Sequence, residues 1–281
     1  MITTYIILFY IKDIPNHHFD WYLVRFNLEQ QIKIHGTYIS LWISIAFLFI
    51  TDYIIHLKKI KLKYGLIILQ LTSLMSLIIV NSRMILFSTI LLSFLQIYFY
   101  FHKKIKTYKL IIPLLLTTIL ISLFSNRYKD DILFLYKNSI KDSSRYTICY
   151  CSIETIKKSH YLGLNNETIQ EKLNDCYDKY GFKELSKENI NSHNQYLDFF
   201  LKGGLVLFIS FLSILLIKLY KSFKTKNFLY FLITLLFTFS FLTENILVRQ
   251  YGIYIYLFCD ILFLGSILGN KSHCCDKIEK S

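Results

Sequence analysis

The sequence predicts an all-α polytopic membrane protein with about seven transmembrane helices and one long extracytoplasmic loop. The chain of 281 residues is 54% hydrophobic and contains only two prolines. Apolar runs of roughly 16–20 residues recur along it, which is close to the length that crosses a bilayer. The runs are apolar on all faces and end in lysine-rich patches or short polar turns, whereas a soluble helix would be apolar on one face only.

The predicted spans follow from the length and uniform apolarity of each run. A hydrophilic stretch of about 70 residues separates the fourth span from the fifth, which is long enough for a small helical subdomain. Within this stretch, apolar positions at Ile148, Ile153 and Ile156 predict a helix over residues 145–158. In chain order, the expected spans cover residues 38–57, 65–80, 84–101, 110–125, 199–217, 228–243 and 253–269.

The lysines indicate which side of the membrane each loop faces. The loops after the first, third and fifth spans carry four lysines each, whereas those after the second and sixth carry one arginine and no lysine. Lysine-rich loops are expected in the cytoplasm. The predicted organisation is an extracytoplasmic segment at 1–37, membrane helices at 38–125, a large periplasmic loop at 126–197, further membrane helices at 198–269 and a cytoplasmic tail at 270–281.

The net charge of +13 does not indicate nucleic-acid binding, because many of the lysines lie in these short loops, where they set orientation. The six cysteines form no metal-binding spacing. Cys149, Cys151 and Cys176 fall in the long loop and could form a disulfide if that loop faces an oxidising compartment. Incidental cysteines are the alternative interpretation.

Arginine is rare in this chain, and its positions are informative. Among 32 lysines and arginines there are only five arginines, and all five fall on the predicted outer side: Arg25, Arg83, Arg127, Arg145 and Arg249. The planar guanidinium binds phosphate through two parallel hydrogen bonds, which lysine cannot do. The pattern therefore favours an anionic ligand on this side. The alternative is that these side chains are solvated charges or reach to the interface from a helix end.

The stretch from Asn191 to Asp198 brings a histidine and two amides to the start of the fifth span. Asn191 or Ser192 is expected to cap the first helical turn. His193 would then lie at the positive end of the helix dipole, which favours the neutral ring that can take a proton from a hydroxyl. A histidine that merely anchors the helix at the interface is the alternative.

An outer site with guanidiniums and one neutral histidine suits transfer from a lipid diphosphate. Arginines would stabilise the diphosphate as it leaves, and His193 would activate an acceptor hydroxyl. Glu244 could orient a substrate hydroxyl or pair with Arg249, and a structural salt bridge is the alternative for that pair. The acidic pair Asp130-Asp131 is expected to be solvated charge, and no metal site is predicted.

The motifs resemble those of the O-antigen ligase family of membrane glycosyltransferases, over about residues 35–265. Asn191-Ser192-His193-Asn194-Gln195-Tyr196-Leu197 with Gly203-Gly204-Leu205 resembles its His-Asn signature. Four further stretches agree in order: His35-Gly36-Thr37-Tyr38-Ile39-Ser40-Leu41, Asn81-Ser82-Arg83-Met84, Ser143-Ser144-Arg145-Tyr146, and Thr243-Glu244-Asn245 with Arg249-Gln250-Tyr251-Gly252. Members usually have about twelve spans, so the chain resembles the C-terminal part of such a protein.

The resemblance implies the fold of the O-antigen ligase branch of the glycosyltransferase C superfamily, in the bacterial inner membrane with the active face toward the periplasm. It implies His193 as the general base and Arg83 and Arg145 on the diphosphate, without metal or cofactor. The implied partners are an undecaprenyl-diphosphate-linked glycan, lipid A–core or a growing glycan as acceptor, and membrane lipids, but no nucleic acid. The further candidate substrate-binding residues are Asn194, Glu244, Arg249, Arg127, His35 and Tyr38.

Other functions remain open at this point. An O-antigen or capsule polymerase would use the same donor, and protein O-glycosylation is a further variant. A non-catalytic membrane protein, such as a transporter component or an inactive remnant, is the alternative from another class. A transporter would more often carry ionisable residues within paired spans, and here these are few: Asp52, His56, Lys202 and Asp260.

Overall fold

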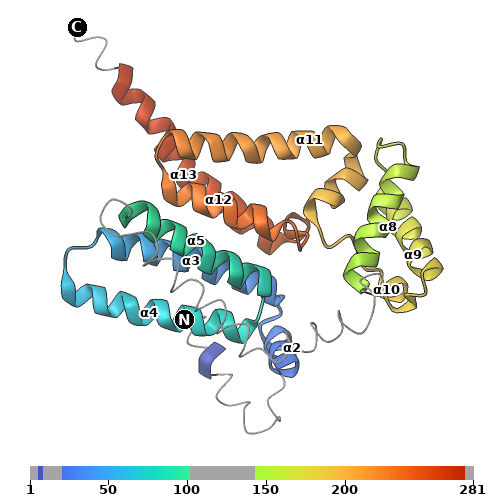
Figure 1. Ribbon diagram of the computed structural model, residues 1–281, viewed down its shortest axis with the longest axis horizontal. Helices are drawn as coiled ribbons and strands as arrows, with labels where there is room; N and C mark the ends of the chain where they lie inside the picture. Colours follow the sequence, from blue (N-terminus) through green and yellow to red (C-terminus); the bar gives the residue numbers. More distant parts are fainter. Residues whose placement is uncertain (1–5, 9–20, 102–142, 276–281) are drawn as a thin grey trace. The chain divides into compact units, whose positions relative to one another are not determined.

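The computed structural model of the chain describes residues 6–8, 21–101 and 143–275 (Figure 1). In these residues the regular structure is helical, without a strand. The chain divides into two units. Unit 1 comprises residues 1–114, 219–240 and 249–281, and unit 2 comprises residues 115–218 and 241–248.

Unit 1 is built around α3, which packs against α4 and α5, the two helices that follow it in the chain, and also contacts α12 and α13. Only short turns join α3 to α4 and α4 to α5, so consecutive helices run in opposite directions. α12 packs against α5 as well as α3, and α2 contacts α4. The helices of this unit are α2 (Trp21–Ile32), α3 (Gly36–His56), α4 (Ile60–Val80), α5 (Arg83–Phe101), α12 (Phe228–Ser240) and α13 (Gln250–Cys275).

Four of the described helices are long and apolar enough to cross a membrane: α3, α4, α5 and α11 (Gln195–Lys224). Two shorter apolar stretches, Phe228–Ser240 and Gln250–Phe263, correspond to the sixth and seventh predicted spans. The predicted span at 110–125 lies outside the described residues. The prediction of an all-α polytopic membrane protein is thereby confirmed.

The predicted start of the second span at residue 65 is wrong. α4 begins at Ile60, so Lys61 and Lys63 lie within its first turn. Lysine has a good intrinsic helix propensity, and its long side chain can carry the ammonium back to the interface. Lysines can therefore extend a membrane helix beyond its apolar run. At the other end, Asn81 stops the helix in the left-handed conformation with φ of 52°.

Polar side chains connect α3 to α4 and α5. Thr89 Oγ1 of α5 donates to Ser44 Oγ of α3 at 2.6 Å, in a fully buried position. Gln70 Nε2 of α4 donates to Thr51 Oγ1 of α3 at 2.7 Å. Hydrogen bonds of this kind hold helices together inside a membrane, where apolar surface alone gives little preference for protein over lipid.

Unit 2 contains a helical subdomain formed by α8 (Ser144–Lys158), α9 (Asn166–Lys179) and α10 (Lys183–Lys187), together with the first part of α11. This confirms the helix predicted at 145–158 and the helical subdomain expected in the long loop. Leu197, Phe200 and Leu201 lie on one face of α11 and join the core of the subdomain. The buried members of that core are Ile148, Cys151, Ile156, Ile169, Leu173, Cys176, Tyr177 and Leu201.

A disulfide between Cys151 of α8 and Cys176 of α9 crosses this core. It is one of the pairings that the sequence left open, while Cys149 is free and exposed. Replacing Cys151 with serine should destabilise unit 2 by about 3 kcal/mol, because the cross-link restricts the unfolded chain. Thermal unfolding and proteolysis of residues 144–190 would measure this loss. Cys149→Ser is the matched control, and equal stability of the two variants would contradict the prediction.

α11 is not the continuous span predicted for 199–217. Gly204 has φ of 61° and ψ of −157°, which breaks the helix. The turn between α8 and α9 is hydrogen-bonded to this break: Leu164 N donates to Leu201 O at 2.8 Å, and Leu205 N donates to Tyr161 O at 2.9 Å. The break therefore attaches the subdomain to the membrane helix through the backbone.

Candidate active site

Two stretches of unit 2 that are about 50 residues apart in sequence are hydrogen-bonded together at the start of α11. Gln195 N donates to Phe241 O at 2.9 Å, and Asn194 Nδ2 donates to Leu242 O at 3.1 Å. Further along, Asn245 Nδ2 donates to Ser192 Oγ at 3.3 Å. These bonds hold the stretch 192–195 against the turn 241–247.

The helix cap differs from the prediction that Asn191 or Ser192 caps the first turn. Asn194 is the cap: its Oδ1 accepts from the backbone N–H groups of Tyr196 at 3.0 Å and Leu197 at 3.2 Å. The side chain of Asn191 instead accepts from His193 N at 3.0 Å, in a local turn. Each of these side chains is a competent cap by itself, so local sequence could not choose among them.

His193 therefore lies before the helix. The sequence predicts it in the first helical turn. Its backbone has φ of 44°, in the left-handed region. Its Nδ1 lies 3.3 Å from Oε2 of Glu244, and 39% of the imidazole side chain is exposed. The nearest charged group recorded for the ring is thus a carboxylate, whereas the prediction relied on the helix dipole.

This pairing determines which nitrogen can act as a base. When Nδ1 carries the proton and donates to Glu244, Nε2 holds the lone pair. A carboxylate in this position fixes the orientation of the ring and stabilises the imidazolium that forms when Nε2 takes a proton. The arrangement can remove a proton from a hydroxyl group placed beside Nε2.

Buried polar side chains at the start of α11 support the contact between His193 and Glu244. Gln195 is fully buried, and its Oε1 accepts from Leu247 N at 2.7 Å. One turn on, buried Asp198 accepts from Lys202 Nζ at 2.8 Å. Sequence reasoning missed both Gln195 and the pairing of His193 with Glu244. The only signal was the polar Thr243-Glu244-Asn245 turn between two apolar runs, which carries no information about its partner.

Two arginines of the long loop, Arg127 and Arg145, were also predicted as site residues. Arg145 is the second residue of α8, and its side chain is exposed, without an ion-pair partner recorded in the described ranges. An exposed guanidinium at this place can bind an anion. Arg127 lies outside the described residues.

Unit 1 gathers its candidates at one end. Arg83 is the first residue of α5, and His35 caps α3, where its Nδ1 accepts from Thr37 N at 3.4 Å. Tyr38 is buried beside Tyr251, with ring centroids 6.4 Å apart. Tyr251 follows the exposed Arg249, so four candidate residues come from helix ends on the same side of this unit: Arg83, His35, Tyr38 and Arg249.

Comparison with known proteins decides the family. The O-antigen ligase family model matches residues 34–212, which is more than half of the chain.

The chain belongs to the O-antigen ligase family.

Membership of the O-antigen ligase family supports a membrane glycosyltransferase-like role for the chain. The matched range contains Arg83, Arg145 and His193, but it ends before Glu244. The carboxylate that contacts the histidine is therefore identified by the fold and not by the family match. No curated protein and no solved structure gives a significant match to the chain.

The family member offers no ready-made metal site in the part that the structure describes. Within residues 21–101 and 143–275, no three histidine, cysteine, aspartate or glutamate side chains gather as a metal ion would require.

Proposed function

We propose that this protein transfers a glycan from undecaprenyl diphosphate to a sugar hydroxyl of lipid A–core, with His193 as the general base. The observation that carries the proposal is the contact between His193 Nδ1 and Glu244 Oε2 at 3.3 Å, made by a side chain that is 39% exposed. A base needs both a fixed ring and access for the substrate, and this arrangement supplies the two together.

The proposed reaction is a single displacement. The acceptor hydroxyl oxygen attacks the anomeric carbon while its proton passes to Nε2 of His193. The bond between that carbon and the diphosphate oxygen breaks, and undecaprenyl diphosphate leaves with the electron pair. Glu244 stabilises the imidazolium until its proton returns to solvent or to the leaving group.

Arginines would bind the leaving diphosphate. Arg145, from the same unit as His193, is exposed, and its guanidinium has no ion-pair partner among the residues that the structure describes. Arg83, at the start of α5, is the second candidate that the family resemblance suggests. Guanidinium groups stabilise developing phosphate charge through paired hydrogen bonds, so both side chains suit this role.

The site would face the periplasm. The distribution of lysines supports this orientation, since lysine-rich loops favour the cytoplasm. The disulfide between Cys151 and Cys176 supports it independently, because disulfides persist in oxidising compartments such as the periplasm. The disulfide and His193 belong to the same unit. The lysine distribution and the disulfide therefore both support a periplasmic location for His193.

Replacing Glu244 with glutamine should slow transfer by roughly 10- to 1000-fold, because the amide cannot stabilise the imidazolium as a carboxylate does. Single-turnover transfer by the purified protein would measure the rate. Glu167→Gln, which alters an exposed acid of α9 in the same unit, serves as the comparison. Activity of Glu244→Gln equal to wild type would contradict the assigned role of Glu244.

Deleting the gene and separating the lipopolysaccharide on gels tests the whole proposal. A ligase predicts core without polymer, together with accumulation of lipid-linked glycan of normal lengths. Core that carries a single repeat unit would instead indicate a polymerase. Unchanged lipopolysaccharide would contradict both activities.

A further inference from the structure

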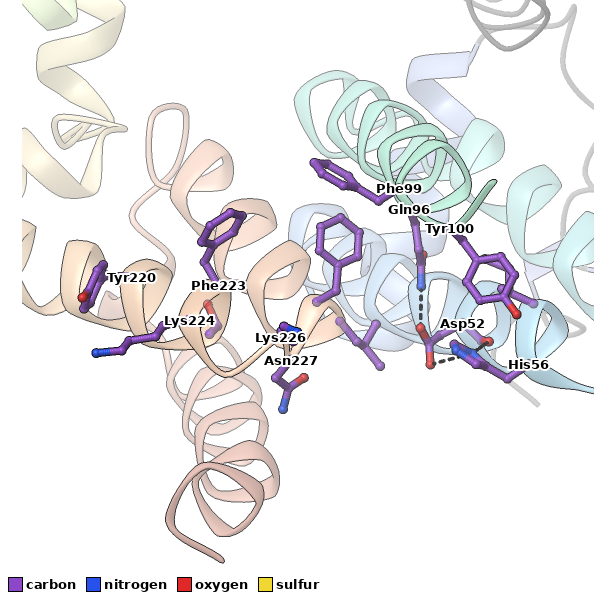
Figure 2. A pocket seen from close by; sticks show the side chains of 14 residues that line it. Asp52, His56, Gln96, Phe99, Tyr100, Tyr220, Phe223, Lys224, Lys226 and Asn227 are labelled. Atoms are coloured by element: carbon purple, nitrogen blue, oxygen red, sulfur yellow. Dashed lines mark hydrogen bonds and ion pairs between the residues drawn. The ribbon is translucent and has the colours of Figure 1, made fainter. Parts of the chain in front are cut away.

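Unit 1 contains a cavity of about 1130 Å³ at the end where α3 and α5 finish (Figure 2). It is closed on the other side by the last turn of α11 and the start of α12. Arg83 and His35 begin α5 and α3, so the cavity lies at the opposite ends of these two helices. It is therefore separate from the candidate residues described above.

One wall of the cavity is a cluster of hydrogen-bond acceptors. Gln96 Nε2 donates to Asp52 Oδ1 at 3.1 Å and to Leu48 O at 3.3 Å. Since both partners are acceptors, the amide orientation of Gln96 is fixed. His56 Nδ1 lies 3.7 Å from Asp52 Oδ2, on the same wall, and Figure 2 shows the three side chains meeting there.

Gln96 provides the observation that indicates a ligand. Its side chain is only 2% exposed, and no partner for its Oε1 is found in the described part of the chain. A buried carbonyl oxygen without a hydrogen bond is costly, particularly in a membrane protein. Together with the carboxylate of Asp52, it forms a place suited to a cationic hydrogen-bond donor.

The facing wall is basic. Lys226 and Asn227 form the turn between α11 and α12, and Lys224 ends α11. Neither lysine has an ion-pair partner among the residues that the structure describes. Ammonium groups at this place suit a phosphate. The cavity thus offers an anion-binding side and a cation-binding side.

The remaining lining is apolar and aromatic, with Phe99, Tyr100, Tyr220, Phe223 and Phe228. Such side chains favour acyl chains and the boundary between headgroups and hydrocarbon. The cavity lies beside the lysine-rich turn that follows α11, where basic pockets between helices bind lipid headgroups. A water-soluble ligand would leave this apolar surface uncovered.

We propose that this cavity binds a phosphatidylethanolamine-type aminophospholipid. The lipid phosphate contacts Lys226, with Lys224 adding positive charge, and its ammonium donates to Asp52 and to Gln96 Oε1. The acyl chains lie along the aromatic side chains. Phosphatidylglycerol satisfies the lysines but leaves the carboxylate of Asp52 without a cation. Binding of this lipid does not require the proposed transfer reaction.

Native mass spectrometry of the full-length protein in detergent, titrated with phosphatidylethanolamine and with phosphatidylglycerol, tests this site. Asp52→Asn should lower the affinity for phosphatidylethanolamine by about tenfold and leave that for phosphatidylglycerol unchanged, because only the ammonium contact is weakened. Lys226→Gln should lower both affinities. Lys221→Gln, which removes a lysine outside the cavity lining, is the matched control and should change neither.

Circular dichroism of each variant checks that its helices remain intact, and Lys226→Gln alters only an exposed turn. Equal affinities of wild type, Asp52→Asn and Lys226→Gln for phosphatidylethanolamine would overturn the proposal. Displacement of the lipid by soluble phosphoethanolamine at similar concentration would also overturn it, because the occupant would then be a soluble phosphate ester.

Discussion

Replacing His193 with asparagine is expected to lower glycan transfer by about 10²- to 10⁴-fold, which is the usual contribution of a general base. The structure provides the reason, because the imidazole contacts Glu244 through Nδ1 and its side chain is partly exposed. Transfer from a lipid-linked donor to lipid A–core by purified protein would measure the rate.

Asparagine is a better replacement than alanine at this position. The backbone of residue 193 has φ of 44°, and asparagine tolerates left-handed conformations more readily than alanine does. His193→Asn should therefore leave the turn before α11 intact. Equal amounts of wild type and variant in the membrane would show that folding is retained, and wild-type transfer by this variant would contradict the assignment of the base.

Replacing Gly204 with alanine is expected to destabilise unit 2 by about 3 kcal/mol or more. The backbone at Gly204, with φ of 61° and ψ of −157°, is essentially restricted to glycine. An added Cβ would also overlap the carbonyl oxygen of Tyr161, which accepts the hydrogen bond from Leu205 N. The turn between α8 and α9 would then have to leave the break in α11.

Gly181→Ala is the matched control, because Gly181 also has positive φ, of 80°, but a Cβ there meets nothing within 4 Å. That variant should cost about 1 kcal/mol, from backbone strain alone. Hydrogen exchange at the amides of Leu164 and Leu205 would report the loss at the break directly. Equal protection of these amides in the two variants would contradict the role assigned to Gly204.

The helices and their class could be predicted because each is encoded locally. Uniform apolar runs give the membrane helices, and the apolar spacing from Ile148 to Ile156 gives α8. The errors at helix ends have local causes as well. Lysines extend α4 beyond its apolar run, and three polar residues within four positions, Asn191, Ser192 and Asn194, compete to cap α11.

The pairing at the candidate site could not be predicted, because it is non-local. His193 and Glu244 are 51 residues apart, and only the packing of the turn after α12 against the start of α11 brings them together. The break at Gly204 depends on the turn between α8 and α9 in the same way. A sequence shows which residues can do chemistry, but the contacts that orient them come from the fold.

The most direct test of the central claim is a double-mutant cycle on the transfer rate, with wild type, His193→Asn, Glu244→Gln and the combined variant. If Glu244 acts by orienting His193 and stabilising its protonated ring, the carboxylate has no role once the imidazole is gone. We expect the combined variant to transfer glycan as slowly as His193→Asn and no slower. Rate losses that simply multiply in the combined variant would contradict it.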